Sequence, residues 1–187
     1  YYKALCNLAT NGDNENEVNK ISLIMKQAKL TTDYRRTTVA AHDRKERSGV
    51  ATAAIELQDG TIITSRTSSL LGPCAALILS ATKHLAGLAH TVKLIPEEMI
   101  APIQKTKVEY LHGHNPRLHT DEVLIALTIS ALESKEAKKA SEQLKNLRGS
   151  EAHFSVILSE ADEKLLRRLG INVSCEPKYE NKRLYHK

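Results

Sequence analysis

Residues 111–122, L-H-G-H-N-P-R-L-H-T-D-E, concentrate side chains that transfer protons or bind ions. His119 stands close to Asp121 and Glu122, and a histidine supported by a carboxylate is a common arrangement for general acid–base catalysis. If the protein is an enzyme, we expect His119 to act as the acid or base and one of the two carboxylates to be its partner. The pattern is compatible with an enzyme and with a binding protein alike.

A second polar stretch, S-R-T-S-S-L-L-G-P-C at residues 65–74, leaves a predicted strand and enters a predicted helix. Ligands of open α/β sheets bind at such strand ends, and arginine is well suited to phosphate or carboxylate. We predict an anion site formed by Arg66, Thr67, Ser68 and Arg117. The ligand would be a small anionic molecule, with a nucleotide among the candidates, between the 65–74 and 115–122 loops. The competing interpretation is a hydroxyl-rich connection without a ligand.

The histidines also raise the question of a metal site. His112, His114 and His119 could coordinate zinc, but the first two straddle a glycine in a predicted loop and no fixed third ligand is evident. Thr120 as a helix N-cap, with Asp121 and Glu122 in the first turn, explains the same residues without a metal. There is no C-x-x-C pair, so we expect no metal and no zinc. Three further histidines are interpreted as structural: His42, His84 and His153.

Hydrophobic periodicity indicates which elements position these stretches. A hairpin with an Asp-Gly turn spans 51–65, helices are predicted at 73–87, from 96, at 120–132 and at 134–147, and strands at 92–95, 152–158 and 171–175. A helix between the last two strands begins with a Ser159/Asp162 capping box. This order predicts a mixed-sheet, three-layer α/β/α domain over residues 50–187. Residues 1–49 are predicted to be a small helical segment, the end of a larger domain that lies upstream.

Composition restricts the class of protein. The net charge is +5, and basic residues are interleaved with acidic ones, so we expect no nucleic-acid binding. The apolar runs are shorter than the roughly 20 residues that cross a bilayer, so we expect no membrane partner. Three widely spaced cysteines argue against a disulfide framework and favour a reducing, cytoplasmic location. Cys74 lies near a helix start, where a thiol is either activated or simply packed.

Several long motifs resemble one family. These are D-G-T-I-I-T-S-R-T-S-S-L-L-G, the E-M-I-A-P-I-Q-K-T-K segment, N-P-R-L-H-T-D-E-V-L-I-A-L and L-G-I-N-V-S-C-E-P-K-Y-E. They resemble the C-terminal part of the bacterial uncharacterised protein family 0371, also called domain of unknown function 1846. The resemblance covers nearly the whole chain. It implies an upstream region with a glycine-rich, phosphate-loop-like stretch, and so a possible nucleotide in the full-length protein.

The resemblance also implies a cytidine-deaminase-like topology without the zinc ligands of deaminases. Those ligands come from the helix starts after the hairpin, where this chain has only Cys74. The family has no established activity, so the resemblance assigns no reaction. We expect the protein to bind a small anionic ligand. The alternative is a non-catalytic scaffold or homo-oligomerisation module, in which the apolar helices at 73–86 and 123–132 are buried against neighbours.

Overall fold

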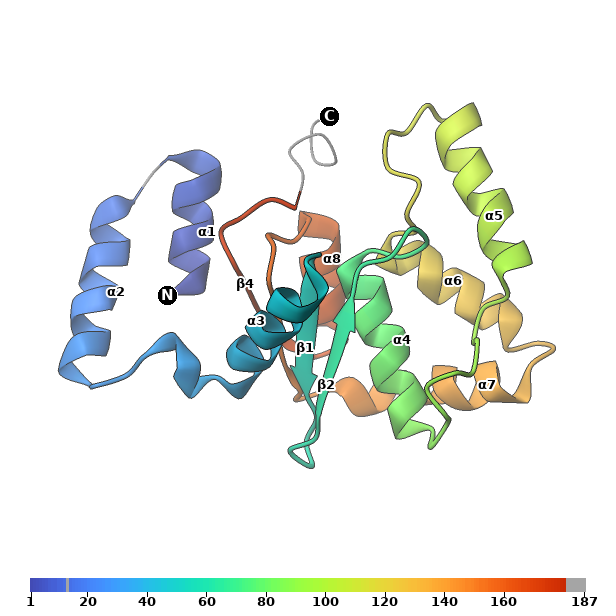
Figure 1. Ribbon diagram of the computed structural model, residues 1–187, viewed down its shortest axis with the longest axis horizontal. Coiled ribbons are helices and arrows are strands. Elements are labelled where there is room, and N and C mark those ends of the chain that lie inside the picture. The colour runs from blue at the N-terminus through green and yellow to red at the C-terminus, as the bar shows by residue number, and fades with distance from the viewer. Residues whose placement is uncertain (13, 181–187) are drawn as a thin grey trace.

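The computed structural model describes residues 1–12 and 14–180 (Figure 1). Within them, four strands form one mixed sheet in the order β2-β1-β3-β4. The strands are β1 (Thr52–Glu56), β2 (Ile62–Arg66), β3 (Glu151–Phe154) and β4 (Asn172–Cys175). The fold is therefore α/β, as the sequence predicts.

The predicted hairpin is present. Strands β1 and β2 pair antiparallel, with Ala54 opposite Thr64. In the turn, the Asp59 carboxylate accepts the backbone N–H of Thr61 at 2.9 Å. Gly60 has φ +82°, a conformation that favours glycine. Local turn chemistry therefore sets the register of the hairpin.

Strand direction brings three strand ends to one edge of the sheet. Strand β1 is antiparallel to β2 and to β3, and β4 is parallel to β3. Strands β2, β3 and β4 therefore run in the same direction and end at the same edge. Each of their carboxyl ends leads into a loop or a helix start, which is where ligands of open α/β sheets usually bind.

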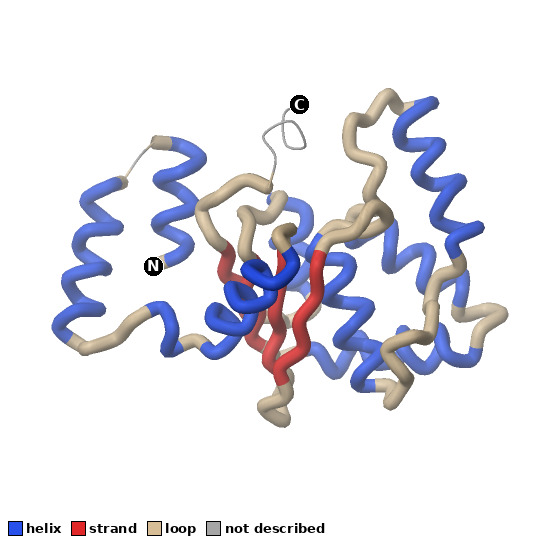
Figure 2. Tube along the Cα trace, viewed as in Figure 1, coloured by secondary structure: helices blue, strands red, loops and turns tan. Residues whose placement is uncertain are grey.

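Helices cover both faces of the sheet, as expected for three layers (Figure 2). Helix α3 (Arg36–Ser48) lies on one face, where the Thr52 hydroxyl of β1 donates to the carbonyl of Ala41 at 2.8 Å. On the other face, Ile55 and Phe154 of the sheet pack against Leu77 of α4 (Pro73–Leu85). The same core includes Leu166 of α8 (Glu160–Arg168), the helix that connects β3 to β4.

A second core joins α4 to the helices outside it. This core is formed mainly by α5 (Glu97–Lys105), α6 (Thr120–Ser130) and α7 (Lys135–Glu142), which lie to the right of the sheet in Figure 1. A π-helix, η2 (Thr106–Tyr110), continues α5, and a 3-10 helix, η3 (Gln143–Leu147), continues α7. Buried residues of this core include Leu94 and Ile95.

Residues 1–49 contain α1 (Tyr2–Asn11), α2 (Glu15–Gln27), the short 3-10 helix η1 (Thr32–Tyr34) and α3. Helix α1 contacts β4, and α3 contacts β1, β2 and β3, so both pack on the sheet. Helix α2 lies at the outside of the molecule and contacts α1 (Figure 1).

The predicted strand at residues 92–95 was wrong. These residues form an irregular segment with a bend at Leu94 and Ile95, whose side chains are buried among helices instead of in a sheet. A short apolar run fits a buried strand and a buried loop equally well, and here the run is buried in the second, helical core. Among the described residues, no helix combines the length and apolar character needed to span a bilayer.

Candidate functional site

The two polar loops singled out from the sequence meet at the carboxyl edge of the sheet. Leu71 and Leu118 form a parallel bridge, and the backbone N–H of Leu118 donates to the carbonyl of Leu70 at 2.9 Å. Beside this contact lies a pocket of about 230 Å³. Its lining residues include Gly72, Cys74, Arg117, His119, Asp162 and Glu180.

Three helices begin at this pocket. Helix α4 starts after Gly72, α6 starts after its N-cap His119, and α8 starts after its N-cap Ser159; all three caps line the pocket. The first backbone N–H groups of a helix have no partner within the helix, and they carry partial positive charge. The edge of the sheet therefore directs three sets of hydrogen-bond donors toward one small volume, which favours an anion.

Asp162 connects two of these helix starts. Its carboxylate accepts hydrogen bonds from the Ser159 hydroxyl (2.9 Å) and from the Thr120 hydroxyl of α6. Burial raises the pKa of the adjacent Cys74 thiol, and the negative charge of Asp162 raises it further. Cys74 therefore stays protonated and is packed in the core, so of the two alternatives raised by the sequence the structure supports packing and not activation.

Arg117 is the cationic group of the pocket. Its Nη1 atom donates to both carboxylate oxygens of Glu180, each at 2.9 Å, and both side chains are largely buried. A second cavity, of about 360 Å³, is lined by Lys45, Ala51 and Tyr179 as well as by Arg117 and Glu180. The Arg117–Glu180 pair therefore borders both hollows.

The other predicted anion-binding residues lie elsewhere. Arg66 is exposed at the end of β2, and none of Arg66, Thr67 and Ser68 lines the pocket. The Thr67 hydroxyl donates to the carbonyl of Leu71 at 3.2 Å, and the Ser68 hydroxyl oxygen accepts the backbone N–H groups of Leu70 and Leu71. These two hydroxyls fold the loop back on itself, which leaves Arg117 as the predicted anion holder at the pocket.

The predicted catalytic residues are divided between the pocket and the cap of α6. His119 lines the pocket, but the N-cap of α6 is His119 and not Thr120, so the predicted cap was wrong by one residue. Glu122 accepts the backbone N–H of His119 at 2.7 Å and pairs with Lys107 at 2.8 Å. Asp121 accepts the backbone N–H of Glu122 at 2.9 Å. Both carboxylates thus stabilise the start of the helix.

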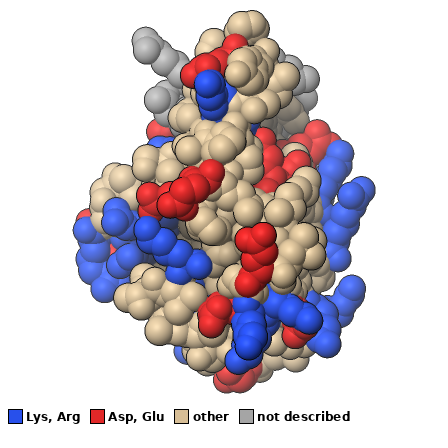
Figure 3. Space-filling model, turned by 90° about the vertical axis from the view of Figure 1, so that its right-hand side faces the viewer, with Lys and Arg blue, Asp and Glu red and all other residues tan. Residues whose placement is uncertain are grey.

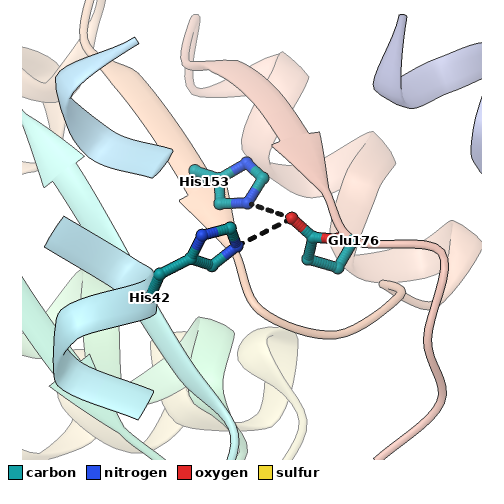
Figure 4. A group of neighbouring side chains, drawn as sticks. All are labelled: His42, His153 and Glu176. Carbon is teal, nitrogen blue, oxygen red and sulfur yellow. Dashed lines mark hydrogen bonds and ion pairs between the residues drawn. The ribbon is translucent and has the colours of Figure 1, made fainter. Parts of the chain in front are cut away.

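Sequence reasoning missed a further group of ionisable side chains, formed by His42, His153 and Glu176 (Figure 4). His42 comes from α3, His153 from β3, and Glu176 directly follows β4. His42 Nε2 lies 2.8 Å and His153 Nε2 3.4 Å from the same oxygen, Glu176 Oε1. The sequence signal for this group is His153, which lies between Ala152 and Phe154 in a predicted strand and is predicted there to be a structural histidine.

Neighbouring residues orient His153 and set its charge. The Nδ1 atom of His153 lies 2.9 Å from Ser174 Oγ, which also accepts a hydrogen bond from Arg35 Nη1 at 2.6 Å. Burial lowers the pKa of His153 to about 4, although the charge of Glu176 opposes this shift, so the ring is neutral at pH 7. Burial would raise the pKa of Glu176, but the combined hydrogen bonds and charges around it, from His42 and Tyr2 among others, hold it below its usual value.

Comparisons with known proteins agree on one family. The family model described as "Domain of unknown function DUF1846, C-terminal" matches residues 33–185. A UPF0371 protein from Streptococcus pyogenes serotype M5 (strain Manfredo) is 46% identical over 187 residues, and one from Corynebacterium urealyticum (strain ATCC 43042 / DSM 7109) is 47% identical over the same length. The chain spans 38% of the length of each of these relatives.

Proposed function

Because the chain belongs to the DUF1846 C-terminal family, whose description assigns no activity, we propose a function from the geometry of its own site: the domain binds a small anionic molecule at the pocket where α4, α6 and α8 begin. The observation that carries this proposal is the contact between Arg117 and Glu180. The Glu180 carboxylate already accepts hydrogen bonds from Arg117, the cation of the pocket. A ligand carboxylate or phosphate would bind Arg117 in the same way.

The charges around the pocket favour a ligand with both acceptors and donors. The helix starts and Arg117 attract an anion, whereas Asp162 attracts hydrogen-bond donors. A molecule that joins an acidic group to hydroxyl or amino groups satisfies both demands. Sugar phosphates and nucleotides have this chemistry, and the pocket alone, at about 230 Å³, suits the smaller of them.

Displacement of Glu180 would enlarge the available space. The Arg117–Glu180 pair lines both cavities, of about 230 Å³ and about 360 Å³, so a ligand anion that takes the place of Glu180 on Arg117 would gain access to the two volumes. We therefore include nucleotides among the ligands and treat Glu180 as a competitor supplied by the chain itself.

Binding to the full-length protein tests this proposal. We expect inorganic phosphate and AMP, titrated at constant ionic strength and followed by calorimetry, to bind with an affinity that Arg117→Met lowers about 10- to 100-fold, because a hydrogen bond to a charged group contributes roughly 1.5–3 kcal/mol. Glu180→Gln should tighten binding, since it weakens the competing ion pair. Arg66→Met is the matched control and should leave affinity unchanged, because Arg66 does not line the pocket. Equal losses in the two arginine variants would contradict the proposal.

An interaction module is the second candidate, and one observation favours it. Ile125, Ile129 and Leu132 lie at helical spacing along α6 and just beyond its end, and they are 62%, 50% and 83% exposed. Figure 3 views the molecule from the side on which α5, α6 and α7 lie in Figure 1, where groups of acidic and basic residues alternate with uncharged areas. Helix α4, by contrast, buries most of its apolar residues within the chain. We propose that α6 contacts another part of the full-length protein.

Three finer expectations remain proposals. The hairpin followed by α4 supports a cytidine-deaminase-like topology. At the positions where deaminases have zinc ligands, this chain would have Cys74 alone. The position of His119 on the pocket wall supports an acid–base role if the ligand is a substrate. Three free cysteines support a reducing, cytoplasmic location.

A further inference from the structure

We propose that His42, His153 and Glu176 bind one divalent transition-metal ion, at a site separate from the anion pocket. The three side chains converge from α3, β3 and the end of β4 (Figure 4). Their ligand atoms all lie within 4.8 Å of one another. None of the three residues lines the pocket at the starts of α4, α6 and α8.

The separations between the ligand atoms suit a metal ion. Zinc binds histidine nitrogen and carboxylate oxygen at about 2.0–2.2 Å, which places two ligands of a tetrahedral ion about 3.3 Å apart. The separations from Glu176 Oε1 to the two histidine nitrogens are 2.8 Å and 3.4 Å. Small side-chain rotations would bring all three atoms into coordination distance of one ion.

The Nε2 atom of His153 is a polar atom that needs a partner. The side chain is fully buried, and the nearest acceptor for Nε2, Glu176 Oε1, lies at 3.4 Å without forming a well-aligned hydrogen bond. Leaving such an atom unsatisfied costs about 1–3 kcal/mol, and a metal ion would accept its electron pair. The burial of His153 therefore distinguishes this group from an ordinary ion pair on the protein surface.

The surroundings of His153 resemble the supporting contacts of metal sites. When Nδ1 carries the ring proton and donates it to Ser174 Oγ, the Nε2 electron pair faces Glu176 and is free to bind a metal ion. Ser174 is held in turn by Arg35 Nη1 at 2.6 Å. Two histidines and one carboxylate are also a common ligand set for zinc and for other first-row ions, and they leave coordination positions for water.

Solvent reaches the site from one side. The His42 side chain is 41% exposed and that of Glu176 is 13% exposed, whereas the Tyr2 ring covers His153 with its centroid 4.7 Å from that of the imidazole. An ion can therefore enter past His42. The exposure of His42 also makes it a residue that can be replaced without disturbing the core.

The test is metal binding by the full-length protein after chelator treatment and buffer exchange. Titration with Zn²⁺ followed by elemental analysis should give one more equivalent in the unmodified protein than in His42→Ala or Glu176→Gln. Co²⁺ at the site should show visible absorption typical of a four- or five-coordinate ion, and both variants should lose that absorption. We expect the loss of either ligand to weaken Zn²⁺ binding by at least about tenfold. Even the loss of a residue that only supports a ligand commonly lowers metal affinity by about that much.

His84→Ala, which removes an exposed histidine of α4, is the matched control and should retain the ion. Circular dichroism of each variant without metal reports whether it is folded, so a loss of binding is interpreted only for folded protein. Ser174→Ala tests the support of His153 and should lower the affinity while the stoichiometry is unchanged. The proposal is overturned if the unmodified protein binds no Zn²⁺ or Co²⁺, or if the folded His42 and Glu176 variants bind as much as the His84 control.

Discussion

Most charged residues near the sheet edge stabilise helix starts, whereas one of them is the proposed ligand-binding group. Asp121 and Glu122 stabilise the start of α6, and Asp162 connects the starts of α6 and α8. Arg117 is different, because its carboxylate partner, Glu180, comes from a distant part of the chain and lies beside two cavities. A ligand that competes for Arg117 therefore breaks a single ion pair without disturbing a helix cap.

Cys6 and Cys175 form a second contact that their sequence positions do not suggest. Their Sγ atoms are 3.6 Å apart, and the Cys6 thiol lies 3.2 Å from the carbonyl oxygen of Cys175. The hydrogen bond between the two thiols raises the pKa of Cys6 and lowers that of Cys175. Cys175 is therefore the thiol of the pair that ionises first and attacks an oxidant.

We predict that mild oxidation joins these two cysteines. Diamide accepts two electrons and two protons from a thiol pair, so treatment should yield a Cys6–Cys175 disulfide that peptide mass spectrometry detects. Cys74 should stay reduced, because it is buried and its pKa is raised. Cys6→Ser should abolish the cross-link. A disulfide that involves Cys74, or three unchanged thiols in the oxidised protein, would contradict the prediction.

At the scale of the elements, helix ends determine how the strands enter the sheet. Helix α8 is followed by Gly170 at φ +78°, and the backbone N–H of Ile171 donates to the carbonyl of Leu166 at 3.0 Å. The carbonyl of Gly170 then accepts the N–H of Gly149, which holds the beginnings of β3 and β4 together. The helix is thus terminated by a residue in the left-handed backbone conformation, which glycine adopts with little strain.

Gly170→Ala should lower the free energy of unfolding more than the same change at Gly49. Both glycines have positive φ, so each alanine costs about 1 kcal/mol in backbone strain. An added Cβ at Gly170 would also meet the Arg148 side chain at 2.9 Å and its Cα at 3.3 Å, whereas Gly49 has open space. Crowding of this kind costs roughly a further 1–3 kcal/mol. Urea unfolding followed by circular dichroism measures the difference, and equal losses would refute the crowding argument.

On the scale of the whole molecule, a sheet edge and the outer face of α6 are the surfaces that we propose for partners. The edge holds the pocket at three helix starts. The outer face of α6 holds exposed isoleucines, and the chain spans only 38% of the length of its relatives. Exposed apolar groups at helical spacing are typical of a contact surface.

We predict that Ile125→Lys destabilises the full-length protein but not this chain alone. In the isolated chain the side chain is 62% exposed, so the change should stay within about 0.5 kcal/mol. If α6 packs against the rest of the protein, the lysine would be buried there at a cost of roughly 1–3 kcal/mol. Ile24 on α2 has the same exposure, 62%, beside exposed Leu23, so Ile24→Lys tests α2 as a contact face in the same way. Urea unfolding of both lengths gives the comparison, and a neutral Ile125→Lys in both would rule out α6 as the contact face.

Local chemistry in the sequence determined most of the elements. The Asp59-Gly60 turn predicts the hairpin, and the Ser159/Asp162 pair predicts the start of α8; both are confirmed because turns and caps depend on neighbouring residues. The family also followed from the sequence, since its motifs extend along the chain. The approach of residues 115–122 to the 65–74 loop was likewise predicted from the general position of ligands at strand ends.

The composition of each site was decided only by the tertiary structure. Arg66 and Arg117 look equivalent in the sequence, but the end of β2 leaves Arg66 exposed outside the pocket while the loop before α6 brings Arg117 to Glu180. His42, His153 and Glu176 come from three elements that only the packing of α3 on the sheet places together. Periodicity and capping report interactions between residues close in the chain. Which side chains then share a site depends on strand order and helix packing, which no local pattern records.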